Sequence, residues 1–134
     1  MLRKIEYLIP AALEAIDATF RTDIQGNGIP SGYQSAASGF GTTLLQMGLL
    51  PTLAVYVDEG SDADIDRKKL LATLQAILAH PDSRFGQKGL LGRQNSLLKD
   101  VLQPGFPQAD FKEHLLQASL AFKLAIRTYK LKKS

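Results

Sequence analysis

The chain has 134 residues, of which 45% are apolar and 22% are charged, and it contains no cysteine. This length and composition predict a single helical domain over residues 1–134, and the lack of cysteine excludes disulfides and thiolate metal sites. Because the sequence holds only two histidines, no zinc site is expected, and neither a cofactor nor another metal is predicted.

Charge is divided unevenly along the chain, although the net charge is only +3. Residues 1–83 carry six basic and ten acidic residues, whereas residues 84–134 carry ten basic and three acidic residues. A basic half predicts a polyanionic partner, and a solvated helix face is the simpler alternative.

The first predicted helix follows apolar residues at helical spacing from Ile5 to Phe20, and Pro10 lies inside this pattern. Proline either kinks a helix or marks its first turn. Residues 3–9 are therefore predicted to form a short lead-in.

A break at residues 25–32 separates this helix from a second one, predicted from about Tyr33 to Met47. Gly48 should stop it, and Pro51 suits the first turn of a third helix over residues 52–57. The predicted buried face of the second helix consists of Ala36, Ala37, Phe40, Leu44 and Met47. Its small residues predict close approach of a neighbouring backbone; they are Ser35, Ser38, Gly39 and Gly41.

The acidic stretch 58–66 predicts a loop followed by a helix cap, because Ser61 and Asp64 have capping-box spacing. The next helix should end at His80 and Pro81. Its apolar positions are Leu70, Leu71, Leu74, Ile77 and Leu78.

Two more helices are predicted, one from Gly89 to Leu102 and a last one that Asp110 caps and that runs to about Leu131. The last helix has one apolar side with Phe111, Leu115, Ala118, Phe122, Ile126 and Tyr129, and another with Leu116, Leu120 and Leu124. A helix with two apolar sides is either central in a bundle or offers one side to a partner. No strands are expected, so the predicted fold is an all-α bundle of about five to six helices.

Candidate catalytic groups are weak throughout the chain. The carboxylates of residues 58–66 lie on a predicted loop without an apolar pocket, and His80 and His114 have no evident nucleophile to serve. Residues 29–57 are small and apolar and carry no reactive side chain, which favours an assembly surface. The chain is therefore not expected to be an enzyme.

The basic residues of the second half could hold phosphates without sequence readout, because few aromatic side chains lie among them for base stacking. The predicted RNA contacts are Lys88, Arg93, Lys123, Arg127 and Lys130. Residues 44–57, the longest uncharged apolar run, are too short to span a bilayer, and no targeting segment is visible. A cytoplasmic protein without membrane contact is expected.

Several short motifs follow one another in a fixed order in the first part of the chain. They are Ile29-Pro30, Tyr33, Ser38-Gly39-Phe40-Gly41, residues 46–49, the group Pro51, Leu53, Ala54 and Tyr56, and residues 67–71. In this order, and in a chain of this length, they resemble the small subunit of Cmr-type (type III-B) CRISPR effector complexes. The similarity covers roughly residues 5–80, and beyond them the length and the apolar, basic last helix agree.

The resemblance implies an all-α, non-catalytic structural subunit in antiviral defence. Copies of it would associate head-to-tail in a minor filament, beside the backbone and large subunits of a Cmr complex. Its basic face would border the guide RNA and the target RNA. The alternative is a stand-alone helical adaptor that binds a protein partner through Leu116, Leu120 and Leu124.

Overall fold

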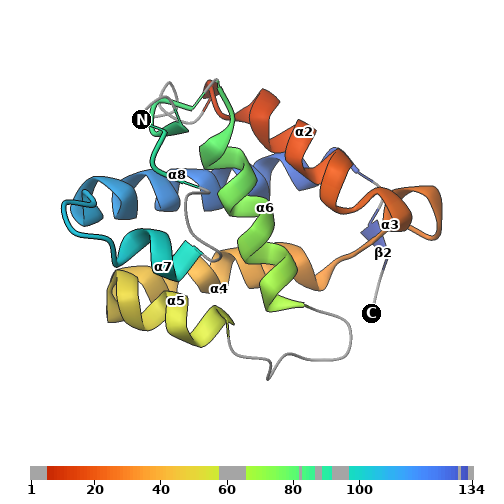
Figure 1. The fold of residues 1–134 in the computed structure, drawn as a ribbon. Coiled ribbons are helices and arrows are strands. Elements are labelled where there is room, and N and C mark those ends of the chain that lie inside the picture. Colours follow the sequence, from red (N-terminus) through yellow and green to blue (C-terminus); the bar gives the residue numbers. More distant parts are fainter. Residues whose placement is uncertain are drawn as a thin grey trace.

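The computed structural model describes residues 6–57, 66–81, 83–86, 89–91, 97–129 and 131–132 (Figure 1). The all-α prediction is confirmed. The elements are α2 (Ile9–Thr19), α3 (Arg21–Gln25), β1 (Ile29–Pro30), α4 (Gly32–Met47), α5 (Leu49–Val57), α6 (Arg67–Ala79), α7 (Leu97–Val101), α8 (Gln108–Ile126) and β2 (Leu131–Lys132).

Helix α8 is the centre of the bundle, and α2, α4 and α6 pack around it (Figure 1). Most of the side chains predicted on its first apolar side are buried, and Phe122 is fully so. On its second side Leu116 and Leu124 pack partly against the core, while Leu120 remains 41% exposed. The central position of this helix therefore explains why it has two apolar sides, since most of these side chains pack against the core. The fully buried aromatic side chains are Phe20, Phe40, Phe85, Phe111 and Phe122.

Two helix starts follow from local chemistry. Pro10 lies in the first turn of α2, so it marks the start of the helix and does not kink it. Asp66 caps α6, because its carboxylate accepts hydrogen bonds from the backbone N–H groups of Lys68 at 2.9 Å and Lys69 at 3.3 Å. The predicted cap at Ser61 and Asp64 lies outside the described residues.

Helices α4 and α5 fold back on each other through Gly48, which ends α4 as predicted. The buried face of α4 differs at one predicted position, since Met47 is 50% exposed and Tyr33 is buried instead. Met47 is the last residue of α4, directly before the turn at Gly48. Close approach occurs at Gly41, whose added Cβ would lie 3.6 Å from Oγ of Ser119 on α8, a side-chain and not a backbone contact.

Gly48 adopts φ 90° and ψ 175°, a conformation that is essentially restricted to glycine. We expect Gly48→Ala to lower the free energy of unfolding by about 1–3 kcal/mol. Gly39→Ala is the matched control, because its Cβ would meet nothing closer than the Tyr56 hydroxyl at 4.0 Å and helical alanine is favoured over glycine. Urea unfolding of both variants checks this, and equal effects would contradict it.

The helix predicted over residues 89–102, before the last helix, differs from the structure in its first part. Residues 89–91 are not helical, Gly89 has φ 66°, and the described helix is only Leu97–Val101. The positive φ of Gly89, a conformation that ends helices, explains why the helix does not extend this far.

The last helix also differs at both ends from its prediction. It begins after Pro107 without a side-chain cap, and Asp110 lies in its first turn. It ends at Ile126 and not near Leu131, because Leu131 pairs with Ile29 in a two-residue parallel ladder between β2 and β1. This short pairing is a local exception to the all-helical pattern.

Tyr129 fixes the chain just before this pairing. Its hydroxyl lies 2.7 Å from Oδ1 of Asp17 and 3.0 Å from the carbonyl oxygen of Leu13, both on α2. Tyr129 and Leu131 are therefore held against α2 and β1, respectively.

Burial raises the pKa of Tyr129 above its ordinary value of 10.0, and the hydrogen bond to Asp17 adds to the increase. Burial also raises the pKa of Tyr33 and Tyr56. A tyrosine with a raised folded-state pKa stabilises the fold fully below about pH 10 and loses this contribution as the pH rises further. The wild-type protein should therefore lose stability between pH 10 and 11 more steeply than Tyr129→Phe. Urea titrations at each pH test this, and parallel losses would contradict it.

Candidate nucleic-acid interface

The structure describes two of the five predicted RNA contacts, Lys123 and Arg127. Lys123 lies half-buried in the last turn of α8, and Arg127 follows the helix directly with an exposed side chain. Lys88, Arg93 and Lys130 lie outside the described residues. Because α8 ends at Ile126, a continuous helical row from Lys123 to Lys130 is not formed.

Lys112 belongs to the same side of α8 and was not predicted. At about 100° per residue, Lys112 and Lys123 are about 20° apart around the helix and about 16 Å apart along it. Arg127, still in helical conformation, lies about 40° beyond Lys123. We call Lys112, Lys123 and Arg127 the basic edge of α8. The spacing of eleven residues between the two lysines, three helical turns, was the sequence signal for Lys112.

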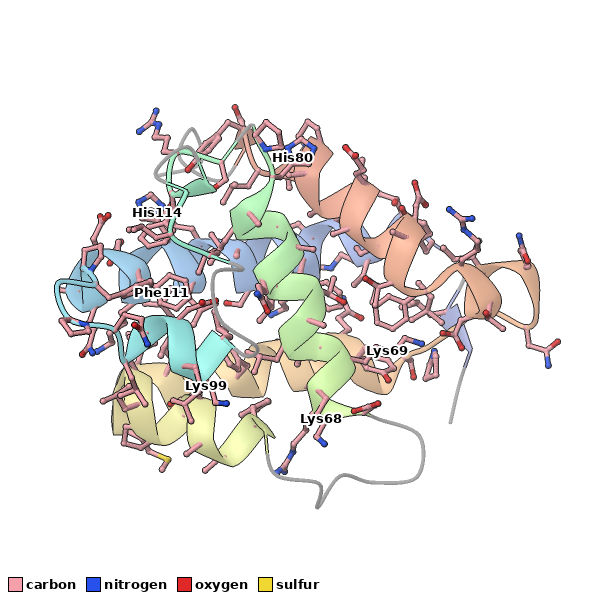
Figure 2. All side chains as sticks on the ribbon, viewed as in Figure 1. Lys68, Lys69, His80, Lys99, Phe111 and His114 are labelled. Atoms are coloured by element: carbon pink, nitrogen blue, oxygen red, sulfur yellow. The ribbon has the colours of Figure 1, made fainter. Side chains whose placement is uncertain are left out.

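Several other described cations make contacts within the protein, and Figure 2 labels one of them, Lys69. Lys69 lies 3.0 Å from a carboxylate oxygen of Asp23 and over the ring of Phe20. Two arginines stack on tyrosines. The guanidinium carbon of Arg67 lies 5.4 Å from the ring centroid of Tyr56, and that of Arg84 lies 5.1 Å from the ring centroid of Tyr7. By contrast, no described carboxylate forms an ion pair with any member of the basic edge. Within the described part of the chain, its charges are therefore not neutralised by a carboxylate.

A structural role also fits part of the basic edge. Lys123 and Arg127 lie at the C-terminus of α8, where a cation complements the helix dipole by about 0.3–1 kcal/mol. Lys112 lies near the opposite end of α8, where the same dipole disfavours a cation. The dipole therefore does not explain the whole edge.

Both histidines have acidic neighbours, and Figure 2 shows them on separate elements. His80 Nε2 lies 2.7 Å from Oε2 of Glu14, and His114 Nε2 lies 3.4 Å from Oδ1 of Asp110. His80 also ends α6, and the ring of His114 packs on Phe85 at 5.6 Å between centroids. Within the described part of the chain, no three His, Cys, Asp or Glu side chains are grouped as metal ligands would be.

The described helices include none that is both long and apolar enough to cross a membrane. Fold and surface together define a small all-helical protein with a basic edge on its central helix. The sequence model of the family described as CRISPR-associated protein (Cas_Cmr5) matches residues 9–123. The chain belongs to this family of CRISPR-associated Cmr subunits. Comparisons with curated proteins and with solved structures give no match.

Proposed function

We propose that the protein is a non-catalytic structural subunit of a type III-B CRISPR RNA-guided effector complex, acting in antiviral defence in the cytoplasm. Family membership supports the complex. The observation that carries the RNA contact is the basic edge of α8, which lacks a described ion-pair partner. In this proposal the edge borders the guide RNA and the target RNA, beside the backbone and large subunits.

Phosphate contact without base readout suits this role. A guide-carrying complex must accept any guide sequence, so its protein surfaces contact the backbone of the RNA duplex. Lysine and arginine neutralise phosphates by releasing counterions, and they do so equally for every sequence. The leucines beside the basic edge offer no ring for base stacking.

Head-to-tail association of copies belongs to the same proposal. The outward side of α2 carries Glu14 and Asp17, and no basic residue lies within α2. An acidic side and a basic edge on one chain permit a contact between different faces of successive copies, which continues into a filament when it does not close. Such association should weaken with salt, and sedimentation showing a monomer at both low and high salt would argue against it.

The adaptor alternative receives less support from the fold. Of its three leucines, Leu116 and Leu124 pack partly against the core, which leaves Leu120 as the exposed one. A single exposed leucine is ordinary for a protein surface.

Salt dependence tests the RNA proposal directly. We expect the purified chain to bind two RNA duplexes of unrelated sequence with similar affinity, and to lose affinity steeply between low and physiological salt. Fluorescence anisotropy at several salt concentrations measures both properties. Binding that depends on sequence, or that salt does not change, would contradict phosphate contact.

A further inference from the structure

Helix α8 ends without a local reason. Residues 124–132 contain no glycine, proline or asparagine, the residues that commonly end helices. The apolar side of α8 continues across its end, because Phe122, Ile126 and Tyr129 are spaced at the helical period. Arg127, which follows the helix, still has helical φ −65° and ψ −19°, and a cation there complements the helix dipole. Local chemistry therefore permits α8 to continue.

The backbone after Arg127 is also close to an α-helix. The N–H of Thr128 donates to the carbonyl oxygen of Ala125 at 3.0 Å. The N–H of Tyr129 donates to the carbonyl oxygen of Ile126 at 3.1 Å. Both bonds join residues three apart, which is the 3₁₀ pattern that often forms the last turn of a helix. A shift of each donor to the preceding carbonyl would convert this turn into α-helix.

Tertiary contacts draw the chain away from that path. The hydroxyl of Tyr129 lies 2.7 Å from Oδ1 of Asp17 and 3.0 Å from the carbonyl oxygen of Leu13. Leu131 pairs with Ile29 in a ladder of only two residues. A hydrogen bond to a charged group shifts an equilibrium by about tenfold, so the bond between Tyr129 and Asp17 is the strongest of these contacts.

We propose that the residues after Arg127 form a switch with two positions, which the bond between Tyr129 and Asp17 holds in one of them. We call the described residues of this segment the strap; they are Thr128, Tyr129, Leu131 and Lys132. In the docked position, seen in the structure, the strap lies on α2 and β1. In the released position it continues α8 as a helix.

The two positions differ in what they offer to phosphates. In the sequence, Arg127 follows Lys123 by four residues and Lys130 follows it by seven, so a helix continued past Arg127 places the three cations on one side. The docked position interrupts this row, and the released position completes it. The strap is therefore an autoinhibitory contact that lowers the affinity for RNA, and bound RNA in turn favours release. This role rests on the proposed function, because it takes RNA as the ligand of the basic edge.

Tyr129→Phe tests the switch, because it removes the hydroxyl that reaches Asp17 and keeps the ring. We expect the backbone chemical shifts of residues 127–131 in nuclear magnetic resonance spectra to move towards helical values. The affinity for an RNA duplex, measured by fluorescence anisotropy at low salt, should rise about three- to tenfold. The matched control is Tyr33→Phe, which removes a tyrosine hydroxyl that accepts a hydrogen bond from the N–H of Asp66 at 2.9 Å. It should change neither property.

The outcomes separate the switch from the proposed function. If residues 127–131 of Tyr129→Phe keep their wild-type shifts, or become disordered and not helical, the switch is overturned. If they become helical and RNA affinity does not change, the autoinhibitory role is overturned. If neither the wild type nor the variant binds RNA, the proposed RNA contact fails and the autoinhibitory role falls with it. The shifts of residues 127–131 then still decide whether the strap has two positions.

Discussion

Phe122→Ala is expected to lower the free energy of unfolding by about 3–5 kcal/mol. Phe122 is fully buried on the central helix, and its ring lies 6.3 Å from the ring of Phe20 on the α2 side of the core. Truncation removes apolar contacts and leaves a cavity between helices that are held by other contacts and close only in part. Urea unfolding followed by circular dichroism measures the change.

The matched control is Leu120→Ala on the same helix. Leu120 points away from the core and is 41% exposed, so its truncation should change stability by less than about 0.5–1 kcal/mol. Similar effects of the two substitutions would contradict a central position of α8 with one buried side.

The double variant Lys123→Gln and Arg127→Gln is expected to weaken RNA binding roughly tenfold near physiological salt. It should also reduce the slope of log affinity against log salt by about two, because two phosphate contacts are lost. Helix content should not change, since Arg127 is exposed and Lys123 is only half-buried. The charge reversal Arg127→Glu should weaken binding in the same direction.

A control variant separates local contact from net charge. Thr42→Glu with Gln46→Glu also lowers the net charge by two, at two exposed positions of α4. If the contacts lie on the basic edge of α8, this variant should retain most of the RNA affinity. Equal losses in both double variants would mean that net charge, and not the basic edge, governs binding.

The sequence predicted those parts of the fold that depend on local chemistry. Gly48 ended α4, and His80 with Pro81 marked the end of α6, since each acts on its own backbone or on the next turn. For Pro10 the sequence allowed either a kink or a helix start, and the structure shows the start of α2. The burial of the Phe122 side of α8 followed from helical periodicity.

Contacts between distant residues decided the parts that could not be predicted. The end of α8 depends on Tyr129 bonding to Asp17 and on Leu131 pairing with Ile29, and neither partner is visible from local pattern. The exposure of Met47 depends on how the chain leaves α4, although its position fits the buried period of that helix.

The candidate interface was predicted in part for the same reason. Periodicity identified Lys123 and Arg127, but it could not separate cations that face solvent from those bound inside the protein. Lys69 illustrates the second kind, because Asp23, far from it in sequence, neutralises its charge.

The central claim is that this chain works within an RNA-guided effector complex, and a tagged pull-down from the native host tests it most directly. The bound nucleic acid is extracted and sequenced, and the bound proteins are identified. The account predicts CRISPR-derived guide RNAs together with several larger Cmr subunits. Recovery of a single protein partner without RNA would contradict the account and would make the basic edge of α8 a solvated surface.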